Sequence, residues 1–212
     1  MVAPTSTDDL TLTLTPPGYI SFQDYLQQYD GIHAEWHNGK VEEVMANNLT
    51  HQNILLFISA VLQLYLGYRP VVQLLLAGFN MYNGEVQRAR QPDLMIVLNE
   101  HRDRILQTYL NGVADIAVEI VSPESVRRDY DTKFAEYASV GVREYWIIDP
   151  MRQVFDIHGL NAEGVYQRAA ADAEGRVISG LLPDFRFDPR VLWQTPLPAG
   201  LALFQVVQAM VG

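Results

Sequence analysis

Three short apolar runs constrain the fold of this chain more than any other feature. They cover residues 71–76, 94–98 and 116–121, with the sequences VVQLLL, LMIVL and IAVEIV. Apolar runs of this length, bounded by turn residues, are typical of buried β-strands. A fourth run, Glu144–Asp149 (EYWIID), is closed by Pro150. The chain is therefore predicted to build a sheet with buried central strands.

Helix signals alternate with these strands. Thr50 is a favourable N-cap for a long helix over 51–66, whose wide apolar surface predicts burial against the sheet. A second helix is expected over 129–140, where Gly141 supplies the stop signal. Strands and helices in this succession predict a mixed sheet flanked by helices.

The N-terminal part of the chain carries its own signals. Residues 1–18 are rich in Thr, Pro and Asp without a sustained period, and are predicted to form a mobile tail. Ser21 can cap a short helix over 22–29. Residues 35–42 (EWHNGKVE) are predicted to form a hairpin, because Asn-Gly is a preferred sequence for a two-residue hairpin turn.

The C-terminal third adds two short strands, predicted over 154–158 and 164–168. The chain is therefore assigned to the α/β (α+β) class, with an N-terminal hairpin and a β-rich C-terminal extension. One domain over 19–195 accommodates these elements. Residues 196–212 form a C-terminal segment that is expected to be helical. Its apolar side docks either on the same core or on a second copy of the chain.

Composition excludes several classes of protein. The chain has no cysteine, which excludes disulfides and thiolate metal sites. Its N-terminus shows no basic region followed by an apolar segment, so a secretory signal is not expected. The apolar stretch over 54–66 is too short for a membrane span. A cytoplasmic protein without membrane contact is the expectation.

The charge of the chain bears on its partners. The formal net charge is −10, whereas proteins that bind nucleic acid draw much of their affinity from basic contacts to phosphates. Arginines do occur in local pairs, which either contact phosphates or are solvated loop residues: Arg88 and Arg90, Arg102 and Arg104, and Arg127 and Arg128.

Two carboxylates stand in positions where a core requires no charge. Asp93 opens the second apolar run, and Glu119 lies between Ala and Val on one face of the third. Burying a carboxylate is costly unless it is paired or bound to a metal. Together they predict a Mg²⁺ site, since this ion prefers oxygen ligands. A buried salt bridge from Glu119 to Lys133 or to an arginine is the alternative.

Four motifs of the chain belong together: Pro92-Asp93, EIVSP over 119–123, the series Asp129, Lys133 and Tyr137, and GVREYWIIDP over 141–150. They resemble the motifs of the Uma2 family, which belongs to the PD-(D/E)XK nuclease superfamily. The similarity extends from about Tyr19 to about Phe187 and includes the 35–42 hairpin. The resemblance implies a restriction-endonuclease-like core in which Asp93 and Glu119 bind Mg²⁺.

One position departs from the superfamily pattern. The pattern places a lysine two residues after the acid, where this chain has Val121. Lys133, one of only two lysines in the chain, is predicted to take over the contact with the phosphate or the attacking water. The alternative is a surface charge on the helix, paired with Asp129 or Tyr137.

Further residues are assigned to the same site. The Ile120 carbonyl is expected to complete the protein ligands of the metal. Glu35, in the hairpin, is either an additional acid of the site or an exposed charge on an edge strand. His51 either reaches the pocket or only caps the long helix. Tyr137 either bonds a phosphate or fills the core.

These observations predict a Mg²⁺-dependent endonuclease that hydrolyses phosphodiester bonds of nucleic acid, with Mn²⁺ as a substitute metal and DNA as the expected substrate. RNA remains open. A homodimer is expected, because nucleases of this fold often pair two sites. The rival hypothesis is a non-catalytic binding or regulatory module on a nuclease scaffold, favoured by the net charge and by Val121.

Overall fold

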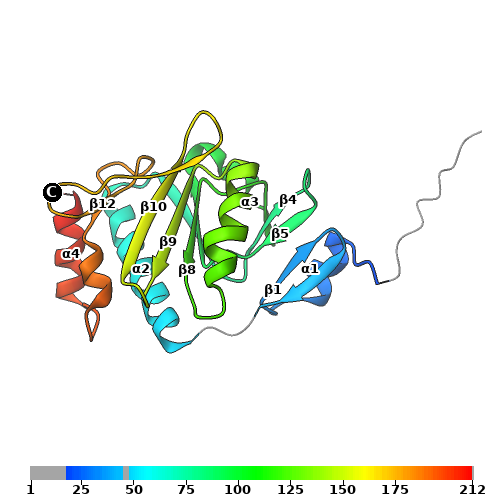
Figure 1. Ribbon diagram of the computed structural model, residues 1–212, viewed down its shortest axis with the longest axis horizontal. Helices are drawn as coiled ribbons and strands as arrows, with labels where there is room; N and C mark the ends of the chain where they lie inside the picture. The colour runs from blue at the N-terminus through cyan, green and yellow to red at the C-terminus, as the bar shows by residue number, and fades with distance from the viewer. Residues whose placement is uncertain (1–17, 45–47, 212) are drawn as a thin grey trace, which may run out of the picture.

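A six-stranded mixed sheet is the centre of the fold (Figure 1). The computed structural model describes residues 18–44 and 48–211. The strand order is β11-β10-β9-β8-β6-β3; β8 and β9 are parallel, and the other neighbours are antiparallel. The strands are β3 Val72–Leu76, β6 Leu94–Leu98, β8 Ile116–Ile120, β9 Glu144–Asp149, β10 Val154–Leu160 and β11 Tyr166–Arg168. The mixed sheet and its four predicted strands are confirmed. Strands β6, β8 and β9 are buried almost throughout, whereas β3 lies at the edge of the sheet and is only half-buried.

A second sheet of five short strands packs beside the first, in the order β2-β1-β5-β4-β7. It contains the predicted hairpin, whose turn residues Asn38 and Gly39 both have positive φ. Three of its strands were not predicted from the sequence, because they have only three or four residues and mix polar with apolar side chains. The bounds are β1 Ala34–His37, β2 Lys40–Glu43, β4 Asn80–Asn83, β5 Arg88–Arg90 and β7 Tyr109–Asn111. A two-stranded ribbon, β12 Val177–Ile178 and β13 Arg186–Phe187, lies near the C-terminus.

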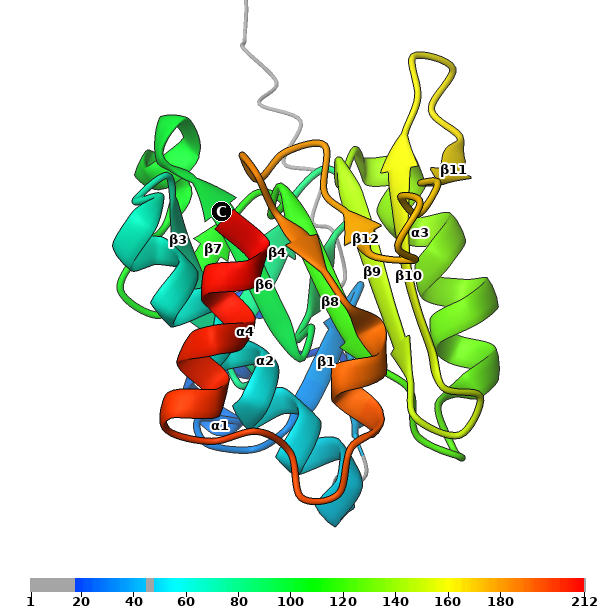
Figure 2. The same cartoon turned by 90° about the vertical axis from the view of Figure 1, so that its left-hand side faces the viewer.

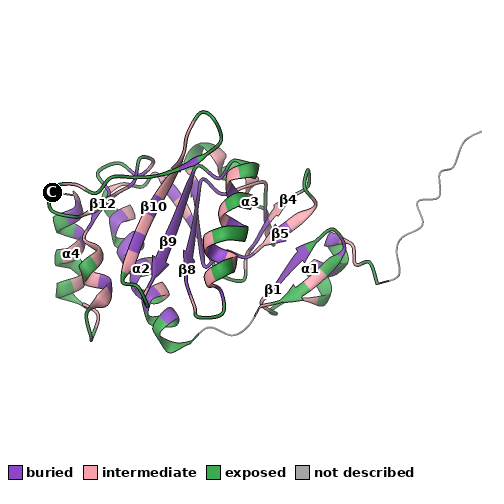
Figure 3. Cartoon of the chain, viewed as in Figure 1, coloured by how far each residue is buried: buried purple, intermediate pink, exposed green. Residues whose placement is uncertain are grey.

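Helices cover both faces of the central sheet (Figure 2). The long helix α2 (Leu49–Tyr68) and the C-terminal α4 (Leu201–Val211) lie on one face, and α3 (Lys133–Val140) lies on the other. The short α1 (Phe22–Gln28) packs on the second sheet, where Phe22 stacks on Tyr82. The predicted layers are confirmed, and Figure 3 shows the purple of buried residues concentrated in the strands.

Strand β8 shows how one sequence serves two cores. Ile116, Val118 and Ile120 pack with α2, while Ala117 and Val121 pack on the opposite face with Tyr137 of α3. This is the period of two expected for a strand. Glu119 belongs by the same period to the α3 face, so the fold leads this carboxylate toward α3.

Two details of the helices differ from the predictions. Helix α2 is capped by Asn48, whose side chain accepts the N–H of His51, so the assignment of Thr50 as N-cap is wrong. The helix predicted over 129–140 begins as a π-helical turn, η2 (Arg128–Thr132), and continues as α3 up to Gly141. Turns with this wider hydrogen-bonding pattern are frequent at functional sites.

The structure tests the prediction for the C-terminal end of the chain but not the one for the N-terminal tail. The predicted mobile tail lies, except for Gly18, outside the described residues. The C-terminal helix is confirmed, and Val207 and Met210 are buried in the core cluster that α2 builds. The apolar side of this helix therefore docks on its own core.

Among the described residues, one helix passes a length and hydropathy test for a membrane span. This helix is α2, and the long central helix of a globular core passes the same test. Its buried side chains include Ile54, Ile58 and Leu62, which pack on the sheet. The packing is that of a core helix.

Glu144 at the start of β9 ties the C-terminal extension to the central sheet. Its Oε2 accepts hydrogen bonds from Trp146 Nε1 and Ser179 Oγ, both at 2.8 Å. Its Oε1 accepts the backbone N–H groups of Gly180 at 2.6 Å and Leu181 at 3.2 Å. One buried carboxylate thus accepts from four donors, of which the Leu181 N–H also donates to Ser179 Oγ at 3.1 Å.

We expect Glu144→Gln to lower the free energy of unfolding by about 1–3 kcal/mol, because the amide nitrogen replaces one acceptor oxygen and leaves buried donors without a partner. Urea denaturation at neutral pH measures the loss. Glu163→Gln at an exposed position is the control. Equal stability of the two variants would contradict the anchoring role of Glu144.

Candidate functional site

The pairing of β6 with β8 places the two predicted metal ligands opposite each other. The register pairs Leu94 with Val118 and Met95 with Ala117, so one step further Asp93 stands across from Glu119. Directly opposed residues have Cβ atoms about 4.5–5.5 Å apart. Asp93 Oδ2 also accepts the backbone N–H of Ile120 at 2.8 Å, which fixes its carboxylate at the end of the sheet.

Lys133 reaches this pair from the first residue of α3. Its ammonium nitrogen lies 2.8 Å from Glu119 Oε1, 3.7 Å from Glu35 Oε1 and 3.7 Å from Asp129 Oδ1. The side chain is buried, so the alternative of a surface charge is wrong. The salt bridge foreseen as the alternative for Glu119 is present, and it joins the two residues on which the catalytic prediction depends.

Glu35 of β1 enters the same pocket from the second sheet. It is buried, so the alternative of an exposed edge-strand charge is wrong. One of its oxygens pairs with the guanidinium of Arg90 on β5, which also pairs with Glu136 of α3. Arg88 pairs with Glu136 as well. The alternative that Arg88 and Arg90 are solvated loop residues is therefore wrong; they are residues of β5 in internal ion pairs.

His51, at the start of α2, approaches from the opposite core. Its Nε2 lies 3.0 Å from Asp93 Oδ2, and its ring is buried. The reading of His51 as a mere capping or solvent residue is wrong. His51 contacts the same Asp93 oxygen that accepts the N–H of Ile120, so two groups fix this carboxylate through Oδ2.

Sequence reasoning overlooked the carboxylate that η2 contributes to the pocket. Asp129 is 1% exposed and lines the same pocket as Glu119 and Lys133. It was considered only as a helix partner of Lys133. The signal that could have found it is its spacing of four residues before Lys133, which brings the two onto one side of a helix. Further lining residues that were given no role are His33, Gln91, Ser125 and Arg128.

Tyr137 fills the core, which was one of the two alternatives predicted for it; the other was a hydrogen bond to a phosphate. Its ring packs in the cluster of Ala117 and Val121, and its hydroxyl donates to Glu119 Oε1 at 2.8 Å. The same oxygen therefore accepts from both Tyr137 and Lys133. Two residues of α3, Lys133 and Tyr137, therefore hold Glu119 through one carboxylate oxygen.

The electrostatics of the pocket are those of crowded negative charge. Burial raises the pKa of Glu119 to about 8, and repulsion from Asp93 and Asp129 adds to this even though Lys133 lowers it. Burial lowers the pKa of Lys133, yet attraction to Glu119, Glu35 and Asp129 outweighs it and holds the pKa above its ordinary value. For Glu35, burial raises the pKa, but Lys133 and Arg90 hold it below its usual range. One ammonium serves three buried carboxylates.

The pocket has the size and the oxygen atoms of a cation site, although Asp93 and Glu119 are paired with protein side chains in this structure. It encloses a void of about 20 Å³, room for one water-sized occupant. Asp129 Oδ1 and Gln91 Oε1 are buried in its wall without hydrogen-bond donors. The N–H and C=O of a strand residue point toward the same antiparallel neighbour, so the Ile120 carbonyl shares the direction of its N–H, toward Asp93. These oxygens fit a hard divalent cation.

Within residues 18–44 and 48–211, however, no three His, Asp or Glu side chains are assembled as a metal-binding group. The reason is visible in the contacts: Glu119 is paired with Lys133, and Asp93 is paired with His51. A cation entering the pocket competes with these partners.

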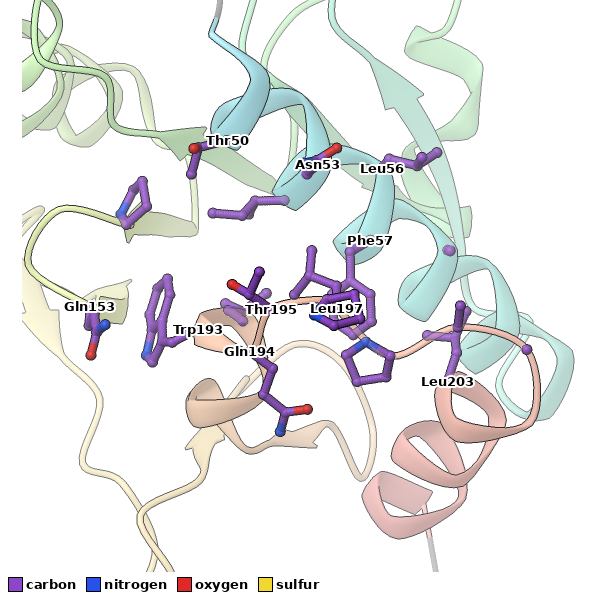
Figure 4. A pocket seen from close by; sticks show the side chains of 18 residues that line it. Thr50, Asn53, Leu56, Phe57, Gln153, Trp193, Gln194, Thr195, Leu197 and Leu203 are labelled. Atoms are coloured by element: carbon purple, nitrogen blue, oxygen red, sulfur yellow. The ribbon is translucent and has the colours of Figure 1, made fainter.

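A larger cavity of about 750 Å³ lies apart from the carboxylates (Figure 4). Side chains of α2, of the 192–200 segment and of α4 form its wall, among them Phe57, Trp193 and Leu203. Among the described residues, no ionisable side chain lines it. The carboxylates and the lysine that acid–base or metal chemistry requires are gathered in the smaller pocket.

Comparison with known proteins bears on this geometry. The family model of Uma2, described as a putative restriction endonuclease, matches residues 22–190. The chain belongs to the Uma2 family. A search of curated proteins finds no match.

One solved structure similar to this Uma2 chain is a crystal structure described as a putative nuclease belonging to DUF820, from Anabaena variabilis. The two share 14% sequence identity over 82% of this chain and 97% of the other, with a TM-score of 0.65. At this identity the similarity shows the fold, which confirms the predicted restriction-endonuclease-like core. For this Uma2 chain, family and fold indicate a nuclease that acts on phosphodiester bonds.

We expect Arg90→Met to lower the free energy of unfolding by about 3 kcal/mol, because the buried carboxylate of Glu35 loses the guanidinium that pairs with it, whereas Glu136 keeps Arg88. Chemical denaturation measures the loss. Arg69→Met is the matched control, since Arg69 pairs with Asp184 on the surface, where such pairs contribute about 0–1 kcal/mol. Equal losses would show that the buried network is not coupled to folding.

Proposed function

We propose that this protein is a Mg²⁺-dependent endonuclease that hydrolyses phosphodiester bonds of DNA, with Mn²⁺ able to replace Mg²⁺. The observation that carries the proposal is the meeting of Asp93, Glu119 and Lys133 in one buried pocket at the end of two central strands. A buried ion network of this kind contributes little net stability compared with apolar packing. Its presence therefore favours a chemical role.

Each residue has a role in this proposal. Asp93 and Glu119, with the Ile120 carbonyl, would hold the cation. When bound, the cation polarises a phosphoryl oxygen and lowers the pKa of a water molecule. His51 fixes Asp93, and Tyr137 fixes Glu119.

Lys133 takes the position that Val121 leaves empty. Val121 packs in the α3-side core, so it has no contact with the pocket chemistry. The ammonium of Lys133 carries a full charge in the pocket and can donate to a phosphate oxygen or to the attacking water. Glu35, paired with Arg90, faces this ammonium at 3.7 Å and adds to the negative charge around it.

The first test is cleavage of plasmid and single-stranded DNA with Mg²⁺ or Mn²⁺. We expect Asp93→Asn and Lys133→Met to reduce the rate at least a hundredfold, since each removes a charge that stabilises the transition state. Lys40→Met, which changes the other lysine of the chain at an exposed position, and Asp131→Asn on the exposed side of η2 are the controls. Wild-type protein that cuts no substrate, or site variants that cut as fast as the controls, would support the rival reading of a non-catalytic module.

A second test separates cation binding from catalysis. Lys133 competes with a cation for Glu119, so we expect Lys133→Met to bind Mn²⁺ at least as tightly as the wild type while it fails to cleave. Isothermal titration calorimetry gives the dissociation constant. A large loss of Mn²⁺ affinity in this variant would contradict the placement of the cation at Glu119. The homodimer and the cytoplasmic location stay predictions.

A further inference from the structure

Asp129 has an acceptor oxygen that nothing in the described structure satisfies. Its Oδ2 accepts the hydroxyl of Ser125, but its Oδ1 has no hydrogen-bond donor. The nearest cations are Lys133 Nζ at 3.7 Å and Arg128 Nε at 3.9 Å, both beyond hydrogen-bond distance. An oxygen without a hydrogen-bond donor on a carboxylate that is 1% exposed lowers the stability of the fold, so its presence requires an explanation.

The position of this oxygen relative to Lys133 suggests the purpose. The ammonium has three N–H donors. It is within bonding distance of Glu119 Oε1 alone, and it faces Glu35 Oε1 and Asp129 Oδ1 at equal distances of 3.7 Å. A shift of roughly 1 Å would bring it into hydrogen-bond range of Asp129.

Cation binding at Asp93 and Glu119 would require such a shift. A divalent cation and an ammonium cannot share Glu119 Oε1 closely, because like charges repel strongly in a buried setting. The Lys133 side chain is buried, so its charge is poorly hydrated. Its charge needs another buried anion to move toward.

We infer that Asp129 is a positioning residue that receives the Lys133 ammonium when a divalent cation occupies Glu119. Glu35 is less suited to this task, because Arg90 already pairs with its carboxylate. Asp129 Oδ1 is free of such a partner, and Ser125 fixes its carboxylate through the other oxygen. The inference rests on the proposed function, since it assumes that the cation binds at Asp93 and Glu119.

The π-helical turn accounts for this placement. Asp129 lies within η2, and Lys133 is the residue that follows the turn. The wider turn alters the α-helical i, i+4 geometry, in which the two side chains would stand directly over each other. At 3.7 Å the Asp129 carboxylate does not draw the ammonium away from Glu119 in the cation-free state. It is still close enough to pair with the ammonium once a cation occupies Glu119.

A double-mutant cycle on Mn²⁺ binding tests the inference. We expect Asp129→Asn to raise the dissociation constant for Mn²⁺ about tenfold, as the removal of a residue that supports a metal ligand commonly does. In the Lys133→Met background the same substitution should have no effect, because the ammonium it serves is gone. Calorimetry on wild type, both single variants and the double variant gives the coupling, and Asp131→Asn is the matched control on η2.

The outcomes distinguish the alternatives. Equal losses in both backgrounds would make Asp129 a direct cation ligand and overturn the positioning role. No loss in either background would also overturn it. Wild-type protein that binds no Mn²⁺ would overturn the metal site of the proposed function together with this inference. If Asp129→Asn fails to fold, Ser125→Ala, which frees the Asp129 carboxylate from its anchor, replaces it in the same cycle.

Discussion

The antiparallel pairing of β6 with β8 is the constraint on which the site depends. A slip of one residue in this register would turn every side chain of one strand to the opposite face of the sheet. Asp93 and Glu119 would then point into different cores. The apolar residues on both faces of β8 prevent such a slip, since Ile116 and Val118 fit the α2 side, whereas Ala117 fits the α3 side. The packing of the core thus fixes the spacing of the carboxylates.

The central sheet supplies carboxylates to the pocket, whereas the second sheet and α3 supply the positive charges that pair with them. Arg90 comes from β5 and Lys133 from α3, and Glu35 connects them by accepting from one and facing the other. The short strands of this sheet also pack against the central sheet, since Met81 of β4 and Leu110 of β7 are buried in the cluster of Ala117 and Tyr137. Through Glu35 and Arg90 they bring a paired carboxylate and guanidinium to the pocket.

The sequence predicted the central strands and the main site residues because both leave local signals. Apolar runs identified the strands, and the residues around Asp93, Glu119 and Lys133 resemble family motifs. It did not predict the role of Arg90, because its partners Glu35 and Glu136 lie 55 and 46 positions away. The reach of Asp129 into the pocket was missed as well, since a π-helical turn has no periodic signature in the sequence. Contacts between distant short elements require the structure.

The charge of the pocket constrains how a nucleic acid could reach it. Four carboxylates, those of Glu35, Asp93, Glu119 and Asp129, line the void with Lys133 and Arg128 as the only lysine or arginine among its lining residues. A phosphate approaching this surface meets net repulsion, which the overall charge of −10 reinforces. A divalent cation would offset that repulsion at the point where the phosphate must bind. Nucleic-acid binding at this pocket is therefore expected to depend on the cation, and a module that binds nucleic acid without one would have to use another surface.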